Sequence, residues 1–191
     1  MEIVLASSSP RRLELLKRIT ENFIVIPSNF DEDTIKFQGD FGKYVVELSE
    51  NKALSVFSKI AEPSIIIGSD TIVAIEGEVL GKPKDRDDAI RMLKKLSGKI
   101  HYVYTGVTVL NTVSNKTVKD FVKTSVKFSK LDDAQICKYV DSGEPYGKAG
   151  AYAIQGYAGV FVEEIHGCFF NIVGLPLNKL KNMLGEMGIN L

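Results

Sequence analysis

The segment Ser7-Ser8-Ser9-Pro10-Arg11-Arg12 places three hydroxyls and two guanidiniums side by side near the start of the chain. The apolar run Ile3–Ala6 precedes it and the amphipathic stretch Leu13–Ile19 follows it, an order that predicts a strand, a polar turn and a helix. Ser9 suits the N-cap of that helix and Pro10 suits its first position. Because a helix start carries free N–H groups and positive dipole charge, this turn favours a phosphate or polyphosphate ligand. The residues expected to bind it are Ser7, Ser9, Arg11 and Arg12.

A second polar cluster, Ser69-Asp70-Thr71, interrupts an apolar run that begins at Ser64 and resumes at Ile72. Polar residues within a buried strand are costly unless they face a site or a partner. Asp70 therefore has two interpretations: it supplies the carboxylate that phosphate chemistry needs, or it caps neighbouring backbone at a bulge. We favour the first, because carboxylates with functional roles gather in such surroundings.

Lys82 stands between Gly81 and Pro83, which fix the turn that carries it. A loop lysine on its own is typical of solvated surface, but Lys82 belongs to the same predicted hairpin as Asp70. Further along, Gln155 has the donor and acceptor atoms that suit recognition of a base edge. An amide that stabilises a turn fits the spacing of Gln155 equally well.

The spacing of two other charged residues gives no indication that they belong to a functional site. Glu32 follows Asp31 in the polar segment 30–40, which predicts an exposed loop, and Lys52 lies in the predicted helix Phe41–Lys59. Each by itself is typical of a solvated surface charge.

The bulk composition limits the class of protein. The chain has 191 residues, 45% of them hydrophobic, which suffices for a sizeable core in one large domain or two joined lobes. Its 24 basic and 24 acidic residues leave no net charge, which disfavours nucleic-acid binding.

The two cysteines and two histidines are too widely spaced for a zinc site, and two cysteines in a chain of this length indicate reduced intracellular thiols. No secretory signal or membrane-spanning run is visible, so we expect a cytoplasmic protein.

Strand and helix patterns alternate along the chain. The strand patterns are Glu2–Ala6, Phe23–Pro27, Ile65–Ile75, Glu78–Leu80, His101–Asn111, Lys116–Phe128 and Gly159–Ile165. The helical patterns are Pro10–Ile19, Phe41–Lys59, Asp85–Leu96, Asp132–Val140 and Leu177–Met187. This alternation predicts an α/β fold, and turns at Glu76-Gly77 and at Asn111–Asn115 predict hairpins that make the sheet mixed.

Several segments, in this order, together resemble the Maf family of nucleoside triphosphate pyrophosphatases, also called septum-formation proteins. The segments that carry the resemblance are Ser7–Arg12, Gly68–Thr71, Leu80–Pro83, Ser97-Gly98 with His101, Thr105-Gly106, Lys148–Gly156 and Asn171–Pro176. They extend over essentially the whole chain, which makes the resemblance far more specific than any single motif.

The resemblance implies a single Maf-like domain over residues 1–191, similar in fold to the inosine triphosphate pyrophosphatases. That fold has an elongated mixed sheet, flanking helices and a deep cleft between two lobes. It implies cleavage between the α- and β-phosphates to a nucleoside monophosphate and pyrophosphate, with Mg²⁺ or Mn²⁺ as cofactor. It also suggests a homodimer, with no nucleic-acid or membrane partner.

The resemblance also implies roles for individual residues. The Ser-Asp-Thr and Ile-Gln-Gly forms look like the branch that acts on dTTP and UTP, in which Asp70 is the proton acceptor. Arg12, Thr71 and Gln155 match positions linked to substrate choice. The polar residues expected around the phosphates and the metal are Glu32, Lys52 and Lys82, with Glu32 and Asp70 as metal ligands and Lys148 among the substrate-binding residues.

Four questions stay open at this point. The first is whether Asp70 accepts the proton from the attacking water or holds the metal that activates that water. Modified pyrimidine triphosphates, such as those of pseudouridine and 5-methyluridine, are compatible substrates. The branch that acts on 7-methyl-GTP is an alternative, although it usually has other residues at the positions of Thr71 and Gln155. The other alternative is a nucleotide-binding regulator of cell division whose hydrolysis is incidental.

Overall fold

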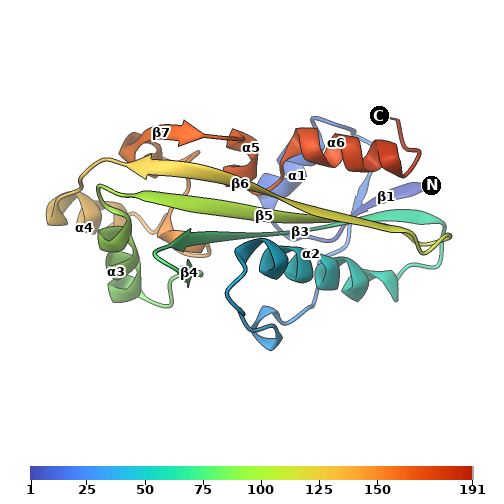
Figure 1. The fold of residues 1–191 in the computed structure, drawn as a ribbon, viewed down its shortest axis with the longest axis horizontal. Helices are drawn as coiled ribbons and strands as arrows, with labels where there is room; N and C mark the ends of the chain where they lie inside the picture. The colour runs from blue at the N-terminus through green and yellow to red at the C-terminus, as the bar shows by residue number, and fades with distance from the viewer. Residues whose placement is uncertain (191) are drawn as a thin grey trace. The chain divides into compact units, whose positions relative to one another are not determined.

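The computed structural model describes residues 1–190 and has a mixed α/β fold built on a seven-stranded sheet (Figure 1). The sheet order is β2-β1-β3-β5-β6-β7, and β4 pairs with β3. The strands are β1 (Glu2–Leu5), β2 (Ile24–Val25), β3 (Ser64–Ile75), β4 (Glu78–Leu80), β5 (Ile100–Asn111), β6 (Thr117–Phe128) and β7 (Val162–His166). The α-helices are α1 (Pro10–Leu16), α2 (Phe41–Phe57), α3 (Arg86–Leu96), α4 (Asp133–Asp141), α5 (Phe169–Val173) and α6 (Leu177–Glu186).

The predicted α/β class and the mixed sheet are confirmed, with several local differences, among them a strand β2 of only two residues where Phe23–Pro27 was predicted. Helix α1 ends at Leu16 and not at Ile19. Residues Tyr157–Phe161 form a 3₁₀ helix, so strand β7 begins only at Val162. Helix α5 was not predicted, because five residues are too few to show a helical period.

The chain divides into two compact units. Unit 1 comprises Met1–Asp70, Thr105–Val122 and the chain from Gly174 onward, and unit 2 comprises Thr71–Tyr104 and Lys123–Val173. The long strands β3, β5 and β6 contribute residues to both units, and the boundary on β3 falls between Asp70 and Thr71. The predicted cleft between two lobes stays a prediction.

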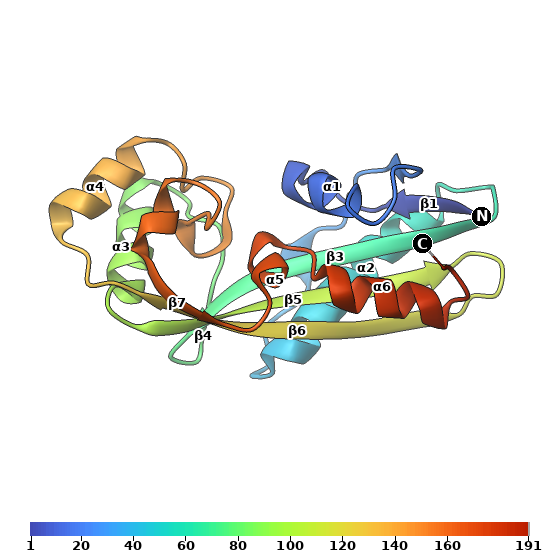
Figure 2. The ribbon, with the colours of Figure 1, turned by 90° about the horizontal axis from the view of Figure 1, so that it is seen from above.

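Unit 1 has helices on both faces of its strands. Strand β1 pairs in parallel with both β2 and β3, the arrangement expected of a sheet covered on both sides. Figures 1 and 2 show α2 and α6 on opposite sides of these strands. Part of the core on the α2 side consists of buried apolar residues from β1 and the residue after it, and from β3, β5 and α2: Val4, Ala6, Ala53, Val56, Ile66 and Leu110.

Unit 2 surrounds a larger apolar core. Its buried residues come from β3 to β6, from α3 and α4, and from the segment 151–161. Hairpin β3–β4 turns at Glu76 and Gly77, both with positive φ (53° and 81°), as a two-residue hairpin turn of the primed type requires. Helix α4 starts with a complete capping box between Asp132 and Gln135, which satisfies two backbone donors at its start.

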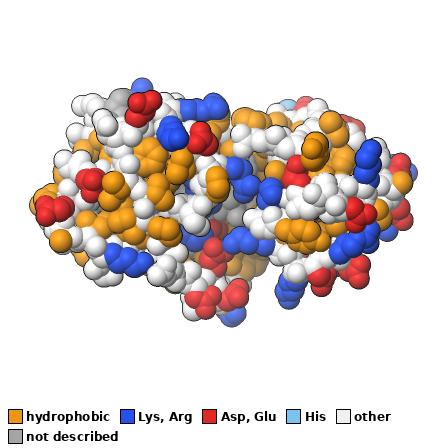
Figure 3. Space-filling view, turned by 180° about the vertical axis from the view of Figure 1, so that it is seen from behind, with side chains coloured by type: hydrophobic (Ala, Val, Ile, Leu, Met, Phe, Trp, Pro, Cys, Tyr) orange, Lys and Arg blue, Asp and Glu red, His pale blue; other side chains and the backbone are white. Residues whose placement is uncertain are grey.

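The surface carries both signs of charge. On the face drawn in Figure 3, basic and acidic side chains are interspersed, as expected for a chain without net charge. None of the helices described within residues 1–190 has the length and apolar character needed to cross a bilayer.

Candidate functional site

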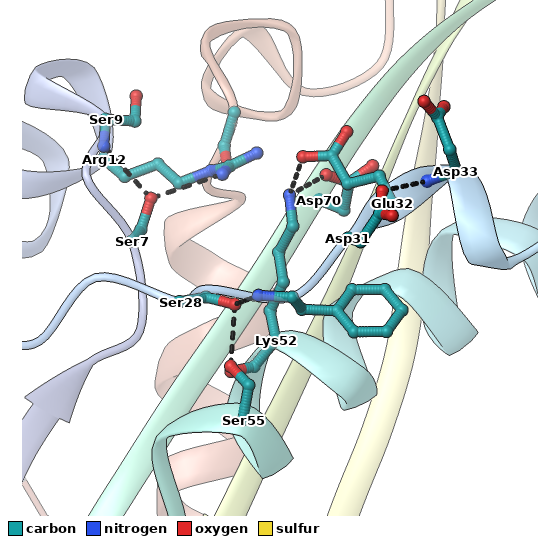
Figure 4. Close-up of polar contacts among 12 residues, drawn as sticks. Ser7, Ser9, Arg12, Ser28, Asp31, Glu32, Asp33, Lys52, Ser55 and Asp70 are labelled. Atoms are coloured by element: carbon teal, nitrogen blue, oxygen red, sulfur yellow. Dashed lines mark hydrogen bonds and ion pairs between the residues drawn. The ribbon is translucent and has the colours of Figure 1, made fainter. Parts of the chain in front are cut away.

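Lys52 connects two carboxylates in unit 1. Its ammonium donates to Oδ1 of Asp70 and, at 2.8 Å, to Oε1 of Glu32 (Figure 4). The side chains of Lys52 and Asp70 are only 11% and 7% exposed, whereas that of Glu32 is 39% exposed. The structure thus brings together three predicted site residues that lie 18 to 38 positions apart in the sequence.

Close backbone contact between α2 and the sheet positions Lys52. A Cβ atom at Gly68 would lie 2.2 Å from the Ser49 carbonyl oxygen, and one at Gly106 would lie 2.1 Å from that of Val45. Only glycine permits this approach. Because Gly68 and Asp70 are two residues apart on β3, they share the face toward α2, so the carboxylate of Asp70 meets Lys52.

A buried hydroxyl pair supports the same contact between α2 and β5. Ser49 Oγ and Thr108 Oγ1 lie 2.8 Å apart, and both residues are fully buried. Strand β3 runs without a break from Ser64 to Ile75. The Asp70 side chain therefore accepts a hydrogen bond from a lysine across the helix–strand contact, and it does not cap the backbone of a bulge.

The serine–arginine turn precedes α1 as predicted, but Ser9 does not cap the helix with its side chain. Ser9 occupies the N-cap position with extended backbone and no side-chain capping bond. Ser7 Oγ instead accepts hydrogen bonds from the Ser9 N–H at 3.2 Å and from Arg12 Nη1 at 3.4 Å. The sequence prediction of a Ser9 cap is wrong because Ser7, two residues earlier, organises the turn.

The Gly174 carbonyl ties this turn to strand β3. Arg12 Nε donates to it at 2.9 Å, and Ser69 Oγ donates to the same oxygen at 3.1 Å. Gly174 has a φ of 120°, a conformation open to glycine. The guanidinium of Arg12 is thereby held beside the strand that carries Asp70 (Figure 4).

The charged groups of this cluster lie close enough to affect the pKa of Arg12. Burial lowers the pKa of the Arg12 guanidinium, while the negative charges of Asp70 and Glu32 act in the opposite sense. Burial also lowers the pKa of neighbouring Arg11. The cluster in unit 1 therefore contains two carboxylates and at least two cations, Lys52 and Arg12, close enough to interact.

Tyr44 is a neighbour of this cluster that sequence reasoning missed. Burial raises the pKa of its phenol, and the charges of Asp70 and Glu32 raise it further. Its ring contacts Phe37 edge to face, with centroids 5.6 Å apart, and Phe37 stacks on Phe41 at 4.6 Å. Tyr44 lies about two turns before Lys52 on α2, so both residues are on the same face of the helix. This spacing indicates that Tyr44 is near the site only when Lys52 is already known to face it.

Unit 2 holds the other predicted site residues. The Gly150 N–H donates to the Gly81 carbonyl at 3.0 Å, so the turn that carries Lys82 meets the turn that follows Lys148. A Cβ at Gly150 would lie 2.9 Å from the Val73 side chain, two residues after Thr71 on β3. The segments of Thr71, Lys82 and Lys148 therefore adjoin one another within this unit.

Lys148 and Gln155 differ in how they are held. The ammonium of Lys148 donates to the carbonyl oxygens of Glu144 and Tyr146 in its own loop. Gln155 is exposed, in the loop before the 3₁₀ helix of Tyr157–Phe161. A substrate role for Lys148 stays a prediction, and so does base recognition by Gln155.

Comparison with known proteins identifies the family. A family model described as Maf-like protein matches residues 2–187. The chain belongs to the Maf-like protein family. The resemblance expected from the motifs is thereby confirmed over almost the full length.

Curated relatives match the chain from end to end. A protein of Clostridium tetani named dTTP/UTP pyrophosphatase is 57% identical over 192 residues, with all of both chains covered. One of Clostridium botulinum with the same name is 58% identical over 191 residues, covering 99% of this chain and 98% of the relative.

Two solved structures are also similar. The Ham1 protein of Staphylococcus aureus has a TM-score of 0.44 at 18% identity, covering 67% of this chain and 72% of that one. A nucleoside-triphosphatase, dITP/XTP pyrophosphatase, of Mycobacterium abscessus has a TM-score of 0.41 at 12% identity, covering 69% and 76%.

Proposed function

We propose that this Maf-like protein hydrolyses dTTP and UTP to the nucleoside monophosphate and pyrophosphate. The observation that carries the proposal is the cluster in which Lys52 joins Asp70 to Glu32, next to the guanidinium of Arg12. Such a cluster offers a carboxylate to act on water and cations to neutralise phosphates. Full-length relatives at 57–58% identity that are named dTTP/UTP pyrophosphatase support the same substrate class.

In the proposed reaction, water attacks the α-phosphorus in line with the bond to the β-phosphate. Asp70 accepts a proton from that water, and pyrophosphate leaves as the α–β bond breaks. Lys52 and Arg12 neutralise charge that accumulates on the phosphate oxygens. The Ser7 hydroxyl and the backbone at the start of α1 position a phosphate group. A role of Lys82, which belongs to unit 2, in neutralising phosphate charge stays a prediction.

The residues present fit a divalent cation that is shared with the substrate. Among residues 1–190, no group of three or more His, Cys, Asp and Glu side chains is arranged to hold a metal ion. Mg²⁺, however, is commonly bound through one or two carboxylates together with substrate phosphates. Asp70 and Glu32 are two such carboxylates, joined by Lys52. A cation bound there would neutralise phosphate charge and lower the pKa of a coordinated water.

A substrate panel tests the proposal. The protein is incubated with Mg²⁺ and, in turn, with dTTP, UTP, pseudouridine triphosphate, 5-methyluridine triphosphate, dCTP, GTP and 7-methyl-GTP. Products are separated by anion-exchange chromatography. We expect a monophosphate and pyrophosphate from dTTP and UTP, with at least tenfold lower kcat/KM for the purines. Release of orthophosphate, or preference for 7-methyl-GTP, contradicts the proposal.

A further inference from the structure

Outside the cluster of Asp70 and Lys52, the carboxylate of Glu144 in unit 2 binds the backbone of a segment that follows it in the chain. Glu144 Oε2 accepts the Tyr157 N–H at 2.9 Å, and Oε1 accepts the Ala158 N–H at 3.4 Å. These N–H groups open the 3₁₀ helix of Tyr157–Phe161, whose N-cap, Gly156, has no side chain to bind them. Glu144, 13 residues before Tyr157, therefore caps this 3₁₀ helix in place of a side chain at Gly156.

The same carboxylate is bound to Tyr139. The Tyr139 hydroxyl donates to Glu144 Oε1 at 3.0 Å. Tyr139 is 4% exposed, and its ring packs edge to face on Phe161 at 5.3 Å. Burial raises the pKa of the Tyr139 phenol, so it remains a neutral donor.

These contacts fix the segment that directly follows Gln155. Glu144 binds the N–H groups of Tyr157 and Ala158, and Tyr139 holds the Glu144 carboxylate in place. Gln155 lies two residues before Tyr157 and is exposed. The anchoring bonds run through backbone atoms, which leaves the Gln155 side chain outside these contacts.

Gly156 makes the arrangement possible. A Cβ there would lie 2.3 Å from Glu144 Oε2 and 2.4 Å from Oε1. Any other residue would push the carboxylate away from the N–H groups that it binds. The glycine that follows Gln155 is thus explained by the carboxylate that packs against it.

We infer that Glu144, together with Tyr139, is a positioning residue that holds the Gln155 loop and thereby sets selectivity among nucleoside triphosphates. This inference rests on the proposed function and on the predicted base contact of Gln155, and it deepens that function by naming what holds the Gln155 loop. Without Glu144, the loop loses the hydrogen bonds at Tyr157 and Ala158 while its own sequence is unchanged. Selectivity then falls, although the groups around Asp70 are intact.

The test compares Glu144→Ala, Tyr139→Phe and Glu144→Gln with wild type. For each, kcat and KM are measured with dTTP and with dCTP. We expect Glu144→Ala to raise KM for dTTP and to reduce the dTTP/dCTP ratio of kcat/KM by about tenfold, the value of one lost hydrogen bond. Turnover with dTTP should change less than threefold. Glu144→Gln retains one acceptor and should be intermediate.

Asp132→Ala is the matched control. It removes the capping box of α4 and lowers the stability of unit 2 without touching the loop, so its nucleotide ratio should equal that of wild type. Gln155→Ala provides the second comparison. If Glu144 acts through Gln155, adding Glu144→Ala to Gln155→Ala should produce no further loss of selectivity.

The outcomes separate the two proposals. A wild-type protein that hydrolyses no triphosphate removes the proposed function, and this inference with it. A selective wild type and a Glu144→Ala variant with an unchanged nucleotide ratio overturn the inference alone. Amide hydrogen exchange gives a readout without substrate: we expect faster exchange at residues 155–158 in Glu144→Ala and in Tyr139→Phe. Unchanged exchange in both variants contradicts the anchoring.

Discussion

Lys52 and Asp70 form an ion pair that is almost completely buried, and the helix of the lysine touches the strand of the aspartate at Gly68, two residues before that carboxylate. A buried charge is tolerated only when it is paired and hydrogen-bonded. Glu32 adds a second, more exposed carboxylate to the same ammonium. The pair therefore has consequences for stability as well as for catalysis.

Removing Lys52 should destabilise the protein. Lys52→Met leaves the Asp70 carboxylate buried without its ammonium, which we expect to lower the free energy of unfolding by about 3 kcal/mol. Lys52→Met/Asp70→Asn should recover at least half of that loss. Urea denaturation of the wild type, both single variants and the double variant measures the coupling.

The control for this cycle is Lys119→Met. Lys119 pairs with Glu50 at 2.7 Å, but its side chain is 47% exposed, so the loss should stay below about 1 kcal/mol. Equal losses at Lys52 and Lys119, or additive effects in the double variant, would show that burial does not couple the pair.

A methyl group at Gly68 should separate α2 from the sheet. The new Cβ would meet the Ser49 carbonyl oxygen at 2.2 Å, and displacement of the helix should cost roughly 1–3 kcal/mol of stability. Because Lys52 moves with α2, activity should fall as well. Thermal unfolding and pyrophosphate release are measured on Gly68→Ala and Gly106→Ala.

Gly185→Ala tests whether this effect is specific. Gly185 lies in α6 with nothing within 4 Å of a built Cβ, so alanine should stabilise the helix by up to about 1 kcal/mol. A Gly68→Ala variant as stable and active as wild type is incompatible with the close contact described above.

The sequence predicted most of the helices and strands and named candidate site residues, but it did not predict the contacts that join those residues. Asp70 was identifiable because a charged residue in an apolar strand needs a partner. The sequence pattern did not distinguish Lys52 and Glu32 from surface charges. Lys52 reaches Asp70 and Glu32 because glycines at positions 68 and 106 let helix α2 approach the sheet closely, and the pattern does not show that approach. The Ser9 cap was predicted wrongly, because a local rule cannot show that Ser7 accepts the N–H of Ser9.

His101 should make stability depend on pH. It is fully buried in unit 2, its Nε2 lies 2.8 Å from the Tyr152 hydroxyl, and burial lowers its pKa from 6.5 to about 4. Below pH 6.5, His101 binds a proton in the unfolded chain but not in the folded protein. The contribution of His101 therefore lowers the free energy of unfolding between pH 6.5 and pH 4, and this contribution stays constant below pH 4. At about 1.4 kcal/mol per pH unit, the loss approaches roughly 3 kcal/mol.

His101→Gln should remove this pH-dependent contribution to the free energy of unfolding. Urea denaturation at pH 7 and pH 4.5 should show a smaller acid loss for His101→Gln than for wild type, by about 2 kcal/mol. His166→Gln is the control for the loss of a histidine, because the His166 side chain is 74% exposed. Parallel curves for wild type and His101→Gln would refute the prediction.

Arg12→Lys should weaken substrate binding more than it slows turnover. The Arg12 guanidinium donates from Nε to Gly174 and from Nη1 to Ser7, a geometry that a lysine cannot reproduce with one ammonium. We expect KM for dTTP to rise about tenfold, from the loss of one charge-assisted hydrogen bond. Arg91→Lys, at an exposed ion pair, should leave KM unchanged. A KM equal to wild type in Arg12→Lys would exclude Arg12 from the phosphate site.

The most direct test of the account is pyrophosphate release from dTTP by Asp70→Asn. The substitution keeps the shape of the side chain and removes the proton acceptor, so kcat should fall roughly a hundredfold or more, while circular dichroism shows a folded protein. Asp120→Asn, which alters a partly exposed ion pair with Lys179, should keep wild-type activity. Full activity in Asp70→Asn would contradict the central claim that this buried carboxylate acts on the attacking water.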